Sequence, residues 1–256
     1  MMKKIYFRNL CFLTNKKLKN DYDILFVLPG LASKAEEYDY FFKIKKKNFQ
    51  VLILDFFFFK NLSHTYGVDY LFYISRQIYL FLKFKKIKKF HFYVHSMSSI
   101  IPILLFKYFV KKRKLSNLIN NEGNLIPSDC SFITQKTVSY DNNFFKNNGY
   151  LNLIKKTQCS DKLEIKDWSA NLLDFDANNF YNFCKSTYFW SNKVDLLFYF
   201  KRFFKKKIYL YGEKSKNPIV LKKLFGCKMV KISNSNHFSH IYNKSFFNRS
   251  LLKLLT

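Results

Sequence analysis

A serine lies between a strand-like segment and a helix-like segment in KKFHFYVHSMSSIIPILL, residues 88–105. Aromatic residues and valine precede the polar cluster at 95–99, and an apolar run follows it. A hydroxyl on a sharp strand-to-helix turn can act as a nucleophile, because the turn exposes its oxygen and the helix N-terminus offers backbone N–H groups to an oxyanion. The alternative is a helix N-cap, a position at which serine is a preferred residue. Ser96 is therefore a candidate nucleophile.

The residues around Ser96 resemble a known motif. His95-Ser96-Met97 in VHSMSS is similar to the GHSMGG turn of α/β-hydrolases, with Val94 and Ser98 where glycines usually stand. The resemblance implies an α/β fold, with a mostly parallel central sheet, flanking helices and a helical cap insertion. It also implies a serine hydrolase that needs no metal or organic cofactor, and we see no metal-ligand spacing in the sequence.

Two further segments follow predicted strands in the order that the family has. LPGLAS, residues 28–33, corresponds to the family's oxyanion loop, with Pro29 in place of the usual histidine. The resemblance implies that backbone N–H groups of Leu31 and Met97 form the oxyanion hole, although a plain Pro-Gly turn is the alternative. NSNHFSHI, residues 234–241, is similar to the family's histidine segment and makes His237 the general base, with His240 as a spare candidate.

The acid that would orient the histidine is less clear from the sequence. Many relatives place an Asp in a GxxD turn after the penultimate strand, but Ser215 stands there in GEKS. Glu122, at the end of the strand after the Ser96 helix, occupies an alternative position that some α/β-hydrolases use. We expect Glu122 to be the acid, with Glu213 as the second candidate, while a plain turn residue is the alternative for Glu122. The family's DxPGxGxS loop survives only as Asp55 and Ser63.

Alternating short apolar runs and longer helical patterns predict a parallel sheet with crossover helices. We predict residues 1–124 and 201–256 to form the core and 125–200 to form the cap. The expected strands are 3–13, 23–30, 49–56, 89–95, 115–123, 206–215 and 227–233, and the expected helices are 34–47, 66–86, 98–112 and 243–255. Eight aromatic residues of the cap either line an apolar cleft or pack between cap and sheet: Trp168, Phe175, Phe180, Tyr181, Phe183, Tyr188, Phe189 and Trp190.

The composition limits the possible partners and location. The 256 residues carry a formal net charge of +28, but only five of the 45 basic residues are Arg, whose planar fork nucleic-acid recognition favours. Lys, Asn, Phe, Ile and Tyr are enriched together, which indicates compositional drift, so we expect no nucleic-acid partner. The five scattered cysteines favour a reducing cytoplasm over a disulfide framework, and the longest apolar runs are too short for a transmembrane helix.

Three functions remain open at this level. The first is hydrolysis of a carboxylic ester or thioester of a small acyl compound by an acyl-enzyme route. The second is hydrolysis of an acyl chain on an acidic carrier protein, which the lysine-rich surface would attract. The third is a catalytically inactive α/β-hydrolase fold that serves as a binding protein, which the departures at Val94, Ser98 and Ser215 favour.

Overall fold

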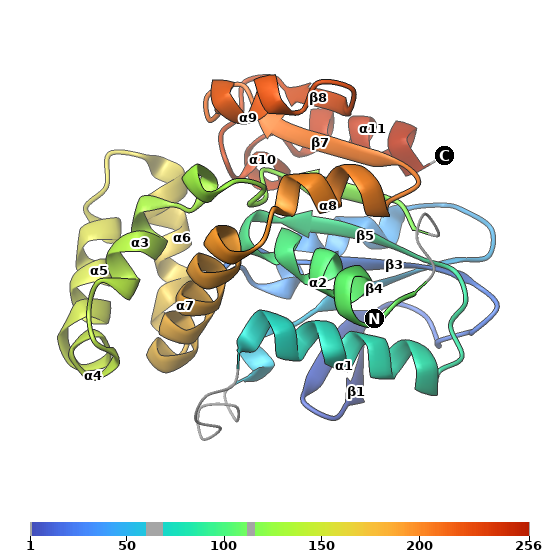
Figure 1. Ribbon diagram of the computed structural model, residues 1–256, viewed down its shortest axis with the longest axis horizontal. Coiled ribbons are helices and arrows are strands. Elements are labelled where there is room, and N and C mark those ends of the chain that lie inside the picture. Colours follow the sequence, from blue (N-terminus) through green and yellow to red (C-terminus); the bar gives the residue numbers. More distant parts are fainter. Residues whose placement is uncertain (1, 60–68, 112–115, 256) are drawn as a thin grey trace.

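An eight-stranded sheet forms the centre of the protein, in the order β1-β2-β4-β3-β5-β6-β7-β8 (Figure 1). The computed structural model describes residues 2–59, 69–111 and 116–255. β2 is antiparallel to both β1 and β4, and the neighbouring pairs from β4 to β8 are parallel. The strands are β1 (Lys3–Phe7), β2 (Leu10–Thr14), β3 (Asp23–Leu28), β4 (Phe49–Leu54), β5 (Phe90–His95), β6 (Leu118–Asn121), β7 (Lys207–Gly212) and β8 (Lys228–Ile232). The predicted α/β class with a mostly parallel sheet is confirmed.

Helices connect the parallel strands and cover both faces of the sheet (Figure 1). Along the core they are η1 (Ala35–Lys43), α1 (Tyr70–Phe84), η3 (Ser96–Ser99), α2 (Ile100–Tyr108), α8 (Leu196–Phe203), α9 (Pro218–Lys223), α10 (Ser239–Tyr242) and α11 (Lys244–Leu255). Between β6 and α8 lie η4 (Pro127–Asp129), α3 (Phe132–Val138), α4 (Asn142–Phe144), η5 (Phe145–Gly149), α5 (Tyr150–Gln158), α6 (Leu163–Asp174) and α7 (Ala177–Lys193).

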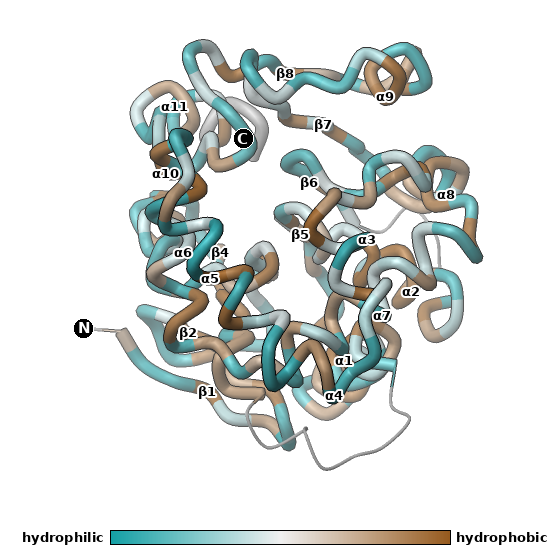
Figure 2. The backbone as a smooth tube through the Cα atoms, turned by 90° about the vertical axis from the view of Figure 1, so that its left-hand side faces the viewer, coloured by the Kyte–Doolittle hydropathy of each residue, from teal (hydrophilic) through white to brown (hydrophobic). Residues whose placement is uncertain are grey.

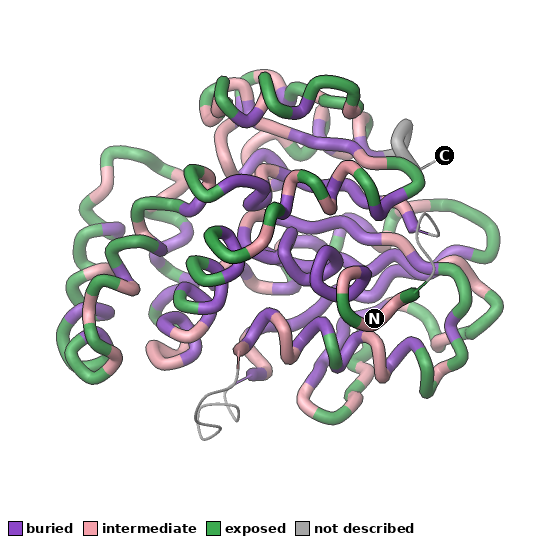
Figure 3. Tube along the Cα trace, viewed as in Figure 1, coloured by how far each residue is buried: buried purple, intermediate pink, exposed green. Residues whose placement is uncertain are grey.

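The core has two apolar layers because successive residues of a strand point to opposite faces of the sheet. On β3, Phe26 faces the layer that α1, α2 and α8 cover, whereas Leu25 and Val27 face the layer that η1 and α11 cover. The central strands are buried along their length, while loops and outer helix faces are exposed (Figure 3). Apolar residues on both faces explain why these strands read as continuous apolar runs.

The helices α3 to α7 gather at one end of the sheet (Figure 1). Seen from that end, β1 and β2 lie at one side of the molecule and β7 and β8 at the other (Figure 2). This end is the one at which the parallel strands finish, so α3 to α6 stand over the loops that follow β3, β5, β6 and β8. The group occupies the segment that we predict to be a cap, and that functional division remains a prediction.

Several predicted elements differ in detail from the structure. The expected strand 3–13 is a hairpin of β1 and β2, with Arg8 at φ 52° in the turn. The expected helix 34–47 is the 3-10 helix η1, and the expected helix 98–112 begins with the 3-10 turn η3 before α2. Ser63 lies outside the described residues. The helix α9, which begins after Asn217 with Pro218 in its first turn, was not predicted.

Candidate active site

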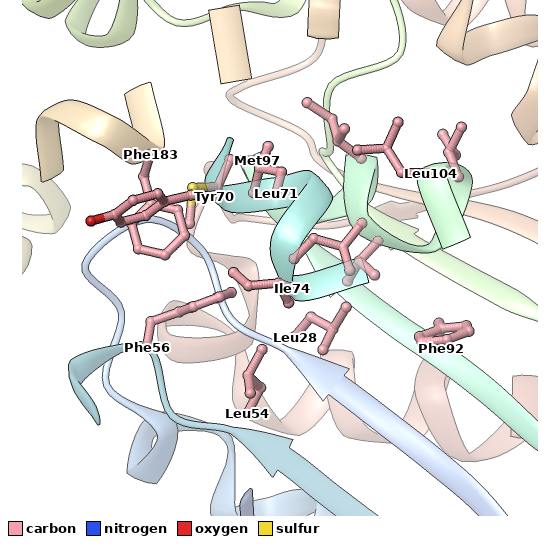
Figure 4. Close-up of a cluster of buried hydrophobic side chains, with 14 of the residues drawn as sticks. Leu28, Leu54, Phe56, Tyr70, Leu71, Ile74, Phe92, Met97, Leu104 and Phe183 are labelled. Carbon is pink, nitrogen blue, oxygen red and sulfur yellow. The ribbon is translucent and has the colours of Figure 1, made fainter. Parts of the chain in front are cut away.

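Ser96 stands at the turn between β5 and the 3-10 helix η3. Its backbone is left-handed, with φ 57°, a conformation that costs energy for a residue with a Cβ and that often marks a functional turn. The Met97 side chain packs in the core beside Tyr70 and Leu71, and this packing fixes the position of the turn (Figure 4). The serine is held in a strained position at the carboxyl edge of the sheet.

The two departures from the family's glycine frame have local explanations. Val94 is a fully buried strand residue of β5, opposite Leu28 and Asn120, so the structure gives it an extended backbone that Val readily adopts. The hydroxyl of Ser98 donates to the Leu28 carbonyl at 2.7 Å and accepts from the His95 N–H at 3.1 Å. Ser98 therefore joins the ends of β3 and β5, and neither residue prevents the turn from forming.

The predicted oxyanion loop follows β3 and lies next to Ser96. Leu31 and Met97 both line the cleft that Ser96 lines. Gly30 is required there, because a Cβ at this position would stand 2.7 Å from His95 Nδ1. The indole N–H of Trp168, on α6, donates to the Leu31 carbonyl at 2.9 Å. A helix of the inserted segment thus helps to fix the loop whose backbone we expect to bind an oxyanion.

Glu122 is the carboxylate that contacts His237. His237 Nδ1 lies 2.9 Å from Glu122 Oε2, and the other carboxylate oxygen accepts from the Gly212 N–H and the Ser215 hydroxyl, each at 2.5 Å. Glu122 is also left-handed, with φ 46°. Ser215 therefore helps to hold a carboxylate that comes from the neighbouring strand end.

The other predicted candidates lie elsewhere. Glu213 accepts a hydrogen bond from the Asn234 N–H and pairs with Lys231 at 2.9 Å, and these two contacts lower the pKa of its carboxyl. His240 is fully buried and its ring stacks on Tyr38 at 4.6 Å. Burial lowers the pKa of His240 to about 3, with the nearby His237 as a smaller cause. The geometry brings His237 to Glu122 and leaves Glu213 and His240 outside this contact.

Sequence reasoning missed a buried chain of hydrogen bonds beneath the turn. His95 Nε2 lies 3.0 Å from the His237 carbonyl, which can only accept, so Nε2 carries the proton. His95 Nδ1 must then accept from the Tyr38 hydroxyl at 2.9 Å, and that oxygen accepts from the Gly30 N–H at 3.4 Å. Burial lowers the pKa of His95 well below its usual value, which keeps this tautomer neutral. The chain links the predicted oxyanion loop, the turn at Ser96 and the loop that carries His237.

The predicted residues meet at a cleft of about 830 Å³ on the carboxyl edge of the sheet. Ser96, Glu122 and His237 line it, together with residues of η4, α3 and α6. Apolar side chains such as Ile133 and Ile165 share the wall with many polar ones. Of the eight aromatic residues proposed for a cleft or for packing, Trp168 lines this cleft, whereas Phe180 and Phe183 are fully buried in the core. Packing is therefore the better account of these two.

The structure also bears on metal binding and on membrane-spanning helices. Within the described ranges, no group of three or more His, Cys, Asp or Glu side chains is placed to hold a metal ion. None of the helices in the part of the chain that the structure describes is long and apolar enough to cross a membrane.

Comparison with known proteins identifies the fold. No protein-family model and no curated protein matches the sequence. Among solved structures, MenH from S. aureus is 15% identical over 93% of this chain and 94% of that chain, with a TM-score of 0.69. An enol-lactonase from Burkholderia xenovorans is 12% identical over 99% of each chain, with a TM-score of 0.73. A carboxylesterase structure from Nitrososphaera gargenis is 11% identical over 99% and 97%, with a TM-score of 0.70. The chain has the α/β-hydrolase fold.

Proposed function

We propose that this protein is a serine hydrolase that cleaves a carboxylic ester or thioester through an acyl-enzyme intermediate. The observation that carries the proposal is the Nδ1–Oε2 hydrogen bond between His237 and Glu122, at a cleft that Ser96 also lines. The names of the structurally similar proteins, among them an enol-lactonase and carboxylesterases, support hydrolysis as the reaction class. The predicted division into core and cap belongs to the same proposal.

In this mechanism Ser96 Oγ attacks the acyl carbon and passes its proton to His237 Nε2, the ring nitrogen that Glu122 does not occupy. The backbone N–H groups of Leu31 and Met97 bind the oxyanion that forms. The imidazolium then protonates the leaving alcohol or thiol. Water, deprotonated by the same imidazole, releases the acid from the acyl-enzyme. Glu122 fixes the tautomer of His237 and stabilises its charged form.

The inactive alternative is less well supported. Ser96 and Glu122 both have a left-handed backbone, which costs on the order of 1–3 kcal/mol per residue, and both line the cleft. A protein that had lost catalysis would have no need of the two donors that hold the second oxygen of Glu122. Strain and a satisfied carboxylate at one cleft together favour an active site.

An acyl chain on an acidic carrier protein is the less favoured substrate. Lysine-rich runs lead into β4, β5 and β7 at residues 45–47, 85–89 and 205–207, at the edge of the sheet away from the cleft. A carrier drawn to those lysines would not present its acyl group to Ser96. A small acyl ester or thioester that diffuses into the cleft is therefore the proposed substrate class.

The test is steady-state hydrolysis of p-nitrophenyl esters of increasing acyl length, together with a small acyl thioester. Ser96→Ala should lower kcat/KM by at least 10³-fold with the best substrate. Ser128→Ala is the matched control, because Ser128 lines the same cleft, and it should change kcat/KM by less than a few fold. Equal activity of wild type and Ser96→Ala would overturn the proposal.

A further inference from the structure

The charged residues are distributed unevenly over the protein. Residues 125–200 hold eight of the 45 basic residues and eight of the 17 acidic ones, so that this segment has no net charge. The large positive excess therefore belongs to the sheet and the helices that flank it. Compositional drift accounts for the number of lysines, but not for this separation from the acidic residues.

Most of the excess lies in segments that lead into parallel strands. Five such segments contain nineteen Lys, one Arg and no Asp or Glu: Lys16–Lys19 before β3, Lys43–Lys47 before β4, Lys83–Lys89 before β5, Lys201–Lys207 into β7, and Lys222–Lys228 into β8. We call these the amino-edge segments. Because the strands they enter are parallel, the segments meet at one edge of the sheet, opposite the cleft. Asp21 and Asp23 are the acidic residues next to them in the chain.

The amino-edge segments form an exposed face. Most of their lysines are exposed, and the loops at the end of the molecule away from α3 to α6 are coloured as exposed in Figure 3. From β4 to β8 the sheet order gives six neighbouring strands, which at about 4.8 Å per strand span roughly 24 Å. The face is thus a broad band of positive charge rather than a single cluster.

Two of the amino-edge segments each carry an exposed phenyl ring. Phe225 is 88% exposed in the turn after α9, between Lys223 and Lys228, and Phe84 is 67% exposed at the end of α1. The turn that carries Phe225 is made possible by Gly226, whose φ of 81° suits glycine. The ammonium group of Lys85 lies 5.0 Å from the centroid of the Phe84 ring. Aromatic rings surrounded by lysines are typical of surfaces that dock on membranes.

We propose that the amino-edge face binds the surface of an anionic phospholipid bilayer. Lysines near such a surface gain electrostatic attraction without needing a fixed geometry, and the two rings can enter the headgroup region. A nucleic acid fits less well, because only one of the twenty basic residues in these segments is Arg. The planar guanidinium group of Arg is the one best suited to bind phosphates and base edges. Docked in this way, the protein would turn its cleft toward the aqueous phase. The proposal is independent of the reaction at Ser96.

Flotation with vesicles tests the proposal. Wild type should float with phosphatidylcholine vesicles that contain 30% phosphatidylglycerol, and not with pure phosphatidylcholine, and added salt should weaken the binding. The variant Lys88→Gln, Lys89→Gln, Lys205→Gln, Lys206→Gln should lose at least tenfold in affinity. Phe225→Ser should reduce the binding that persists at high salt.

The matched control neutralises four exposed lysines on α3, α5 and α6: Lys136, Lys155, Lys156 and Lys166. It has the same net charge as the amino-edge variant and should retain wild-type binding. Leu151→Ser, which removes an apolar side chain that is 57% exposed on α5, is the control for Phe225→Ser. Thermal unfolding midpoints confirm that each variant is folded. Equal losses in the two quadruple variants, or tight binding of a mixed-sequence RNA oligonucleotide with no vesicle binding, would overturn the proposal.

Discussion

Glu122, at the end of β6, and His237, in the loop after β8, are joined by a 2.9 Å contact across 115 residues of sequence. Glu122 follows β6, which is the strand next to β7 in the sheet. Ser215 lies in the turn that follows β7. The same carboxylate receives the Ser215 hydroxyl and the Gly212 N–H. The Glu122 carboxylate and its two donors form one hydrogen-bonded group at the carboxyl edge of the sheet.

The first prediction concerns the role of this acid. Glu122→Gln keeps the shape of the side chain but no longer fixes the tautomer and charge of His237, so kcat should fall by about 10²–10⁴-fold. Glu213→Gln is the control, because Glu213 pairs with Lys231, and it should change kcat less than twofold. Steady-state ester hydrolysis measures both. A larger effect of Glu213→Gln would show that the acid is misassigned.

The second prediction moves the acid to the β7 turn. In the Glu122→Gln background, Ser215→Asp restores a carboxylate at the position that many relatives use, and it should recover kcat by at least tenfold. Ser215→Asn in the same background introduces a similar shape without the charge and should recover nothing. If Ser215→Asp and Ser215→Asn give the same kcat in this background, a carboxylate after β7 cannot replace the one after β6, and the prediction is wrong.

The third prediction concerns the chain from Gly30 through Tyr38 to His95. Tyr38→Phe leaves the Gly30 N–H and His95 Nδ1 without their shared partner, which should cost about 1–3 kcal/mol of unfolding free energy. Because the same chain holds the oxyanion loop and the His237 carbonyl, kcat should also fall, by roughly tenfold.

Tyr150→Phe is the matched control for this effect. Its buried hydroxyl donates to the Leu172 and Phe175 carbonyls, far from the predicted catalytic residues in the sequence. This variant should lose comparable stability in urea unfolding and keep its kcat. Equal kcat values for the two variants would show that the Gly30–Tyr38–His95 hydrogen bonds contribute to stability alone.

The fourth prediction is a loss of stability at low pH. His95 and His240 are buried, and their pKa values are lowered by that burial, so they stay neutral in the folded protein while an unfolded chain protonates them below about pH 6.5. The free energy of unfolding is therefore unaffected by protonation of these two histidines above pH 6.5, and it decreases as the pH falls from 6.5 toward 3. Each histidine should contribute about 1 kcal/mol per pH unit in that window.

Urea unfolding between pH 7.5 and 4.5 measures this slope. His240→Phe keeps an aromatic ring against Tyr38 and removes one titrating group, so the slope should fall by about 1 kcal/mol per pH unit. The groups facing His240 are Tyr38, His95, His237 and Lys244, and none of them is altered by this change. A slope equal to that of wild type would contradict the account of His240 as a neutral buried residue.

The fold class could be predicted from the sequence because the buried strands are continuous apolar runs. Runs such as 23–28 and 49–54 are apolar on both faces, as buried parallel strands must be. The same reasoning put Ser96, Glu122 and His237 at strand ends, and carboxyl ends of parallel strands share one edge. Their catalytic roles remain predictions.

Other features depend on contacts that no local pattern encodes. The Tyr38–His95 bond joins residues 57 positions apart, and the direction of a Tyr hydroxyl inside a 3-10 helix is set by tertiary packing. The link from Trp168 to the Leu31 carbonyl spans 137 positions and needs the placement of α6 over β3. The role of Ser215 was missed because its partner comes from a different strand end.

Labelling with a fluorophosphonate probe, followed by peptide mapping, tests the central claim most directly. The probe phosphonylates a serine only where a base activates the hydroxyl and an oxyanion site receives the charge. The account predicts one adduct on the peptide that contains Ser96, slowed strongly by His237→Ala and absent in Ser96→Ala. Equal labelling of wild type and Ser96→Ala would contradict it.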